Sequence, residues 1–278
     1  MDMQAFAPLI TYPAANSDAL AANAVAIAAQ VGASLHAFAL NADIPPISNA
    51  FSHVLLNVPD MIREAGGASR KRGEHLLEAV RTQAAAAGVT ATTTALTAQP
   101  VLLCEVAASH ARYFDFSLLG WEAGNQTAEA TAEAVVFGSG RPAILLPEKG
   151  SAARIDHVVI AWDGSRVAAR AVADAQPFLA RAAKVSVLTV VDEKPLKEKN
   201  AAERLAEGLR QRGLAAEAAE IRADKRPIAE VLQKTAIERG GNLLVMGGYG
   251  HSRLRDFVLG GATKGVLDEL LLPALLSH

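Results

Sequence analysis

Residues 242–263 read NLLVMGGYGHSRLRDFVLGGAT and join an apolar strand pattern to a glycine-rich turn and to a second glycine pair. The strand pattern ends at Met246, and Gly247, Gly248 and Gly250 follow it. The second pair begins a predicted helix. Glycines at the carboxyl end of a strand and at the start of a helix let backbone N–H groups approach an anion. Because open parallel sheets bind ligands at that edge, the stretch predicts an α/β fold with a phosphate or nucleotide site.

These glycines also have a simpler explanation, since glycine pairs at strand–helix junctions often serve tight turns and helix ends alone. The sequence contains no G-x-x-x-x-G-K-[ST] motif, and Arg253 replaces the third glycine of G-x-G-x-x-G. A nucleotide bound here would therefore use another loop geometry.

The composition predicts two soluble domains. A chain of 278 residues is long enough for two cores, and with 51% apolar but only 5% aromatic residues those cores consist of alanine, leucine and valine. A net charge of −2 argues against a nucleic-acid partner. The single cysteine, Cys104, excludes an internal disulfide, fits a reducing compartment and has apolar neighbours that predict a buried thiol.

Neither a leader peptide nor a membrane span is apparent in the sequence. A span needs about 20 apolar residues, and the closest candidate, residues 267–276, is interrupted by Asp268, Glu269 and Pro273. We therefore expect a cytoplasmic location and no membrane partner.

The two halves of the chain repeat the same pattern. Ile10 corresponds to Ile160 and Leu40 to Val190, each at an offset of 150 residues. Later segments correspond at an offset of about 130, which places an insertion of about twenty residues in the first half, within 43–67.

Short apolar strands alternate with helical patterns in both halves, which is typical of β-α-β units on a mostly parallel sheet. We expect two tandem Rossmann-like α/β domains, 1–148 and 149–278, each with a five-stranded sheet covered by helices on both faces. The predicted strands cover residues 6–12, 33–40, 116–120, 141–146, 157–162, 185–191, 242–246 and 272–276, and the predicted helices 17–31, 71–88, 166–183 and 201–213.

This layout resembles the universal stress protein family in its tandem two-domain form. Residues 159–165, VIAWDGS, look like the family's first strand and acidic turn. Gly247, Gly250 and Gly260 follow the spacing of its nucleotide-binding signature. The resemblance covers the whole chain in layout and is specific in residues 155–278.

The resemblance implies an adenine-nucleotide site in the second half. On the base side, Asp163 would lie against the adenosine, Ala161 and Trp162 would line the base pocket, and Val190 would meet the adenine. On the phosphate side, the implied residues are Met246 and Gly247 beside the ribose, Gly250 in the turn, and Gly260 and Gly261 with N–H groups for phosphate oxygens.

One position departs from the family signature, which continues with Ser or Thr where this chain has Gly261. A hydroxyl that would donate to phosphate is therefore missing, although Thr263 could replace it. Losing a hydrogen bond to a charged group costs about 1.5–3 kcal/mol, which is roughly ten- to hundredfold in affinity.

The first half departs further. Tyr12 and Pro13 occupy the positions of Trp162 and Asp163. Trp121 and Glu122 occupy the would-be phosphate turn, where Glu122 would repel phosphate. We interpret domain 1–148 as a degenerate copy that packs without binding nucleotide.

The predicted function is therefore binding of ATP or another adenine nucleotide, with or without Mg²⁺, by the C-terminal domain in a stress-response or regulatory role. We expect no enzymatic activity, because no general base is evident near the phosphate turn. The seven histidines lack metal-ligand spacing, so we expect no protein-bound metal. The alternative is a nucleotide-free scaffold or protein-interaction module with a silent pocket and no cofactor.

Several secondary assignments remain open. His251, Arg253, Arg255 and Lys264 could neutralise phosphate or simply be solvated. Asp163 or Ser165 could cap the following helix. The apolar segments 143–146 and 274–276 would be edge strands through which the two halves form an intramolecular pseudo-dimer, with a homodimer of the whole chain left open.

Overall fold

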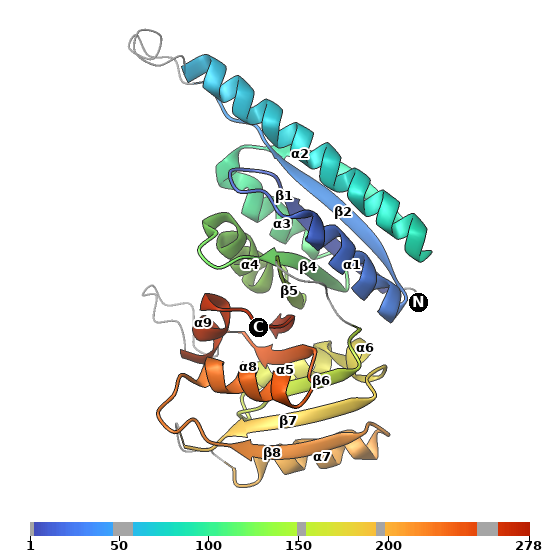
Figure 1. The fold of residues 1–278 in the computed structure, drawn as a ribbon, viewed down its shortest axis with the longest axis vertical. Helices are drawn as coiled ribbons and strands as arrows, with labels where there is room; N and C mark the ends of the chain where they lie inside the picture. The colour runs from blue at the N-terminus through green and yellow to red at the C-terminus, as the bar shows by residue number, and fades with distance from the viewer. Residues whose placement is uncertain (1–2, 47–57, 149–153, 193–197, 249–260) are drawn as a thin grey trace. The chain divides into compact units, whose positions relative to one another are not determined.

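The computed structural model describes residues 3–46, 58–148, 154–192, 198–248 and 261–278. The chain forms two compact units, each α/β (Figure 1). The first unit comprises Met1–Gly120 with Asn125–Ser139, and the second comprises Trp121–Gly124 with Gly140–His278.

The first unit contains a parallel sheet in the order β3-β2-β1-β4. β1 and β2 are rich in alanine, leucine and phenylalanine and are largely buried, as expected for inner strands covered on both faces. The register between them runs from Met3 beside Ala33 to Ile10 beside Leu40. The strands are β1 (Met3–Ile10), β2 (Ala33–Ala42), β3 (Ala91–Ala98) and β4 (Phe116–Trp121).

Helices in the first unit pack in two pairs, α1 against α2 and α3 against α4. Helix α1 is capped at its carboxyl end by Gly32, which adopts a left-handed conformation with φ 69° and donates its N–H to carbonyls in the last turn of the helix. The helices are α1 (Asp18–Val31), α2 (Val58–Ala87), α3 (Leu103–Ala111) after the 3₁₀ turn η1 (Pro100–Leu102), and α4 (Gln126–Gly138).

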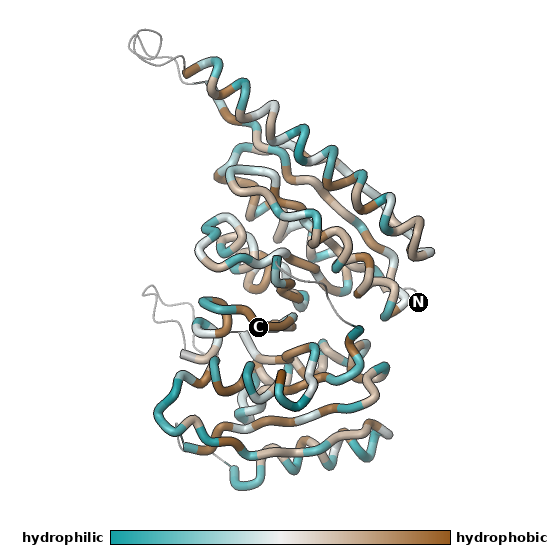
Figure 2. The backbone as a smooth tube through the Cα atoms, viewed as in Figure 1, coloured by the Kyte–Doolittle hydropathy of each residue, from teal (hydrophilic) through white to brown (hydrophobic). Residues whose placement is uncertain are grey.

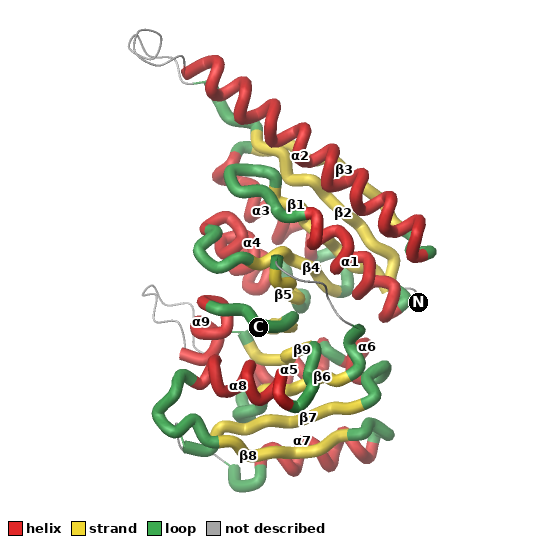
Figure 3. The backbone as a smooth tube through the Cα atoms, in the orientation of Figure 1, coloured by secondary structure: helices red, strands yellow, loops and turns green. Residues whose placement is uncertain are grey.

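Among the described residues of the second unit, the strands follow the order β5-β10-β9-β6-β7-β8. Figure 3 shows β9, β6, β7 and β8 as neighbouring strands of this sheet. All pairs are parallel except β5 with β10, which is antiparallel and sets Leu145 beside Ala274. Its strands are β5 (Ala143–Pro147), β6 (His157–Ala161), β7 (Lys184–Val190), β8 (Ala216–Ile221), β9 (Leu243–Gly247) and β10 (Ala274–Ser277).

Helices of the second unit connect these strands, and α8 packs against α9. In Figure 2 the strands are mostly hydrophobic, whereas hydrophilic and hydrophobic residues alternate along α2 of the first unit and α7 of the second. The helices are α5 (Arg166–Asp174), α6 (Gln176–Leu179), α7 (Ala201–Gln211), α8 (Ile228–Glu238) and α9 (Gly261–Asp268).

The predicted fold class is confirmed, since the described part of each repeat contributes five strands in the same β-α alternation. Two helices differ from expectation. The predicted helix 166–183 is divided after Asp174, and Pro177 in α6 lacks the N–H that a continuous helix needs. Helix α2 begins at Val58, so part of the insertion is helical, whereas residues 47–57 lie outside the described residues.

Candidate functional site

The direction of strand addition reverses between β6 and β9 in the second unit. From β6 the chain adds β7 and β8 on one side, and then crosses to β9 and β10 on the other. In open α/β sheets a ligand crevice forms outside the carboxyl ends of the strands at such a reversal. The carboxyl ends of β6, β7 and β9 therefore form the candidate site.

The carboxyl end of β6 presents two partly exposed residues, Ala161 and Trp162. The backbone of Trp162 is held against β7, because its N–H donates to the carbonyl of Leu188 at 2.8 Å and its carbonyl accepts from the Thr189 hydroxyl at 2.8 Å. The position of the Trp162 backbone is thus determined by two contacts to the neighbouring strand.

Asp163 and Ser165 shape the turn that leads from β6 into α5. Asp163 is exposed, and one of its carboxylate oxygens accepts the N–H of Ser165 at 2.9 Å. Ser165 in turn accepts the N–H of Ala168 at 3.2 Å and so caps α5. The question of which residue caps this helix is settled in favour of Ser165.

At the end of β9, Met246 is buried and Gly247 lies directly against the first turn of α5. A Cβ on Gly247 would come within 2.7 Å of backbone atoms of Val167 and Ala168. Close helix–strand packing therefore requires this glycine, independently of any ligand. The next residue, Gly248, is buried and donates its N–H to the carbonyl of Ser277 at 2.7 Å.

At the end of β7, Val190 is partly exposed and pairs in register with Ile221 of β8. Just beyond it, the Asp192 carboxylate accepts the N–H groups of Ala223 at 2.8 Å and Asp224 at 2.9 Å. Those two bonds lower the pKa of Asp192. The sequence analysis did not single out Asp192, because no local pattern indicates this contact. Asp224, which donates one of these hydrogen bonds, has a left-handed backbone conformation with φ 49°.

The phosphate side of the candidate site is described only in part. Gly250 and Gly260 lie outside the described residues, as do His251, Arg253 and Arg255. Gly261 is the first residue of α9, Thr263 is buried in its first turn, and Lys264 is exposed. The structure thus brings Ala161, Trp162, Asp163, Val190, Met246 and Gly247 to one edge of the sheet.

Comparison with known proteins bears on this half directly. Residues 154–277 match the model of the universal stress protein family. This half of the chain belongs to that family. No curated protein matches the sequence significantly.

Solved structures extend the likeness of fold to the whole chain. A universal stress protein from Archaeoglobus fulgidus DSM 4304 superimposes with a TM-score of 0.70 at 15% identity, over 98% of this chain and 95% of the other. A universal stress protein assigned by similarity in Pseudomonas aeruginosa UCBPP-PA14 gives a TM-score of 0.55 at 15% identity, over 99% and 93%. Both halves therefore share the universal stress protein fold.

In the first unit, side chains of the chain itself bridge the corresponding edge. The Thr11 hydroxyl donates to the carbonyl of Leu40 at 2.7 Å and lies 2.7 Å from the hydroxyl of Ser69 on α2. Ser69 also accepts the N–H of Ala42 at 2.9 Å. These contacts join the ends of β1 and β2 to α2. They lie next to Tyr12 and Pro13, the positions at which the universal stress protein domain of the second half has Trp162 and Asp163.

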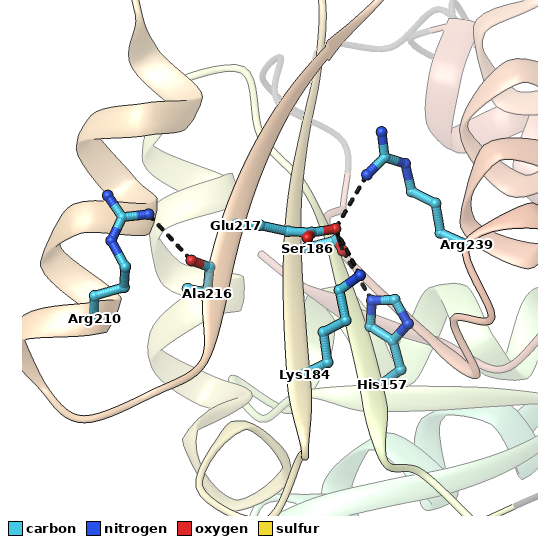
Figure 4. Close-up of polar contacts among 7 residues, drawn as sticks. All are labelled: His157, Lys184, Ser186, Arg210, Ala216, Glu217 and Arg239. Atoms are coloured by element: carbon cyan, nitrogen blue, oxygen red, sulfur yellow. Dashed lines mark hydrogen bonds and ion pairs between the residues drawn. The ribbon is translucent and has the colours of Figure 1, made fainter.

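The opposite edge of the second unit carries a polar cluster of His157, Lys184, Ser186, Glu217 and Arg239 (Figure 4). Nε2 of His157 lies 2.8 Å from the Ser186 hydroxyl, which donates to Glu217 at 2.9 Å. The Glu217 carboxylate also accepts from Lys184 at 2.9 Å and from Arg239 at 3.1 Å.

This polar cluster is structural rather than nucleophilic. Ser186 is fully buried, and Glu217 contacts the serine instead of orienting the histidine, as a Ser–His–acid triad requires. Burial lowers the pKa of His157, and the Lys184 charge adds to the effect. The hydrogen bond from Lys184 lowers the pKa of Glu217. The cluster ties the amino ends of β6, β7 and β8 together.

Within the part of the chain that the structure describes, no group of three or more His, Cys, Asp or Glu residues could hold a metal ion. The described helices also include none that is long and apolar enough to cross a membrane. Cys104 lies on α3, where it is half-buried rather than fully buried, with its sulfur 3.5 Å from the Thr131 hydroxyl.

Proposed function

We propose that the C-terminal domain binds an adenine nucleotide as a regulatory ligand in a cytoplasmic stress response, without catalysing a reaction on it. The observation that carries this proposal is the meeting of two strand ends at the reversal of the sheet. Trp162 and Asp163 follow β6, Met246 and Gly247 end β9, and the capped start of α5 lies against Gly247.

The base end of the proposed site has the chemistry that an adenosine needs. Trp162 and Val190 are only partly buried, so they can contribute apolar surface to a purine. Asp163 is exposed at the same edge and can accept hydrogen bonds from the ribose or the base amino group. The bridge from Asp192 to the loop after β8 keeps the ends of β7 and β8 together beside it.

The phosphate end relies on main-chain groups. Helices α5 and α9 both begin at this edge, and helix N-termini carry a partial positive charge that favours anions. Exposed Arg166 and Lys264 lie in those first turns and add formal positive charge. ATP or AMP fits this arrangement, and any Mg²⁺ would arrive with the nucleotide.

Titration calorimetry of the full chain with ATP, ADP and AMP tests the proposal. We expect saturable binding, weakened because Gly261 supplies no hydroxyl. Substituting Gly261→Ser should tighten binding by roughly tenfold, since a hydrogen bond to a charged phosphate contributes about 1.5–3 kcal/mol. Folded protein that releases no heat up to millimolar nucleotide would exclude this function.

A nucleotide-free scaffold is the second candidate. Gly261 and the bridged edge of the first unit favour it. In that case Gly261→Ser would leave the calorimetric trace flat, and the two halves would serve as an intramolecular pseudo-dimer that binds a protein partner.

A further inference from the structure

Trp121 connects the degenerate first repeat to the proposed phosphate helix of the second. Although it ends β4, it is part of the second unit and only 4% of its surface is exposed. Its indole Nε1–H donates to the carbonyl of Leu267 at 2.9 Å. Leu267 lies in the last turn of α9, where carbonyls have no partner within the helix. Trp121 thus supplies a hydrogen-bond donor, from outside the helix, to a carbonyl at the carboxyl end of α9.

Two further residues, Gln233 and Gly265, fix the carboxyl half of α9 against α8. Gln233 of α8 is 1% exposed, donates to the carbonyl of Glu269 at 2.7 Å, and accepts the N–H of Leu271 at 2.8 Å. Gly265 lies so close to α8 that a Cβ would come within 2.6 Å of Ala229. The carboxyl half of α9 is therefore held by side chains from two other elements.

Fixing one end of α9 also places its other end. Residues Gly261–Asp268 form a helix about 12 Å long at 1.5 Å per residue. So short a helix moves as a rigid rod, because its backbone hydrogen bonds link both ends within two turns. The N–H groups at its start are those proposed above to meet phosphate.

We propose that Trp121 is a positioning residue for nucleotide binding, supplied to the C-terminal domain by the first repeat. The inference rests on the proposed function and adds a residue outside the nucleotide signature. It also explains the departure in the first half, since Gly120 and Trp121 stand where the second half has Gly247 and Gly248. In the first repeat, this tryptophan replaces a glycine of the phosphate-binding turn. In the second repeat, it holds α9, the helix whose N-terminus is proposed to bind phosphate.

The test compares Trp121→Phe, which keeps an aromatic ring but removes the donor, with Ile144→Val in buried β5 as a control for general loss of stability. By calorimetry, Trp121→Phe should weaken ADP binding about three- to tenfold. Hydrogen exchange should also become faster in α9. The control should lower the melting temperature without changing ADP affinity.

A second measurement uses the wild-type sequence, which has only two tryptophans, Trp121 and Trp162. Labelled with 5-fluorotryptophan, it gives two ¹⁹F resonances, and Trp162→Phe assigns them. Since coupling between sites is reciprocal, saturating ADP should shift the Trp121 signal. If the chain binds ADP but Trp121→Phe binds equally well, or if the Trp121 signal stays unmoved, the inference is wrong while the proposed function stands. A wild-type chain that binds no ADP overturns both.

Discussion

Gly247 shows how packing at a single residue shapes the candidate site. Its missing side chain lets α5 approach β9, since a Cβ would lie 2.7 Å from the backbone of Val167 and Ala168. We expect Gly247→Ala to destabilise the second unit by about 1–3 kcal/mol, the usual cost of overpacking, as measured by urea unfolding. Gly208→Ala on α7 is the control, because a Cβ there has no described atom within 4 Å. If both variants match the wild type, the proposed packing role is refuted.

The polar cluster at the opposite edge predicts a pH dependence of stability. Burial lowers the pKa of His157, so the folded chain binds fewer protons than the unfolded one once the pH falls below about 6.5, the ordinary histidine value. Stability should therefore decrease as the pH falls from about 6.5 towards the lowered pKa. Glu217, whose pKa is also lowered, loses its contribution in a more acidic range.

Urea midpoints measured between pH 7.5 and 5.5 check this sign. His157→Gln should reduce the decrease without abolishing it, because burial also lowers the pKa of His36 in the first unit. If His157→Gln loses stability with falling pH as steeply as the wild type, the pKa of His157 does not differ between the folded and unfolded states.

At the scale of elements, the start of α5 depends on one hydroxyl. Ser165 accepts the N–H of Ala168, and replacing such a cap by alanine costs about 0.5–2 kcal/mol. We expect that loss for Ser165→Ala in urea unfolding, and little or none for Ser165→Asn, which keeps an acceptor. Equal losses in the two variants would mean that the hydrogen bond is not the source of the stability.

Elements buried on both faces were predictable from sequence, because their apolar runs leave few alternatives. β6, β7 and β9 start and end close to the predicted positions. The edge strands β3 and β8 carry threonine or glutamate in place of an apolar run and were not predicted. The start of α2 was missed because Gly66 and Gly67 interrupt its pattern.

The positions of candidate-site residues were predictable where the residue type is typical of a turn at the end of a strand, as for Asp163 and Gly247. The bridge from Asp192 to Ala223 was not, since it joins loops 31 residues apart and depends on their conformation. Likewise, no local pattern indicates that Trp121 meets Leu267, 146 residues away.

At the scale of the whole molecule, the sequence repeat and the compact units have different boundaries. The repeat suggests a division near residue 148, whereas β5 from the first repeat pairs with β10 inside the second unit. A repeat records the order of elements along the chain, but strand pairing depends on which edges meet in space. β5 pairs along one edge of β10 with its buried residues Ala274, Leu275 and Leu276.

The difference between the boundaries predicts how the C-terminal repeat behaves on its own. Residues 149–278 lack β5, so the apolar edge of β10 is uncovered and should pair with a second copy, as unprotected edges do. Sedimentation velocity at micromolar concentration should therefore show a dimer that dissociates on dilution. A folded fragment that sediments as a monomer at every concentration would show that the edge of β10 needs no partner, and the sequence repeat would then also be the folding unit.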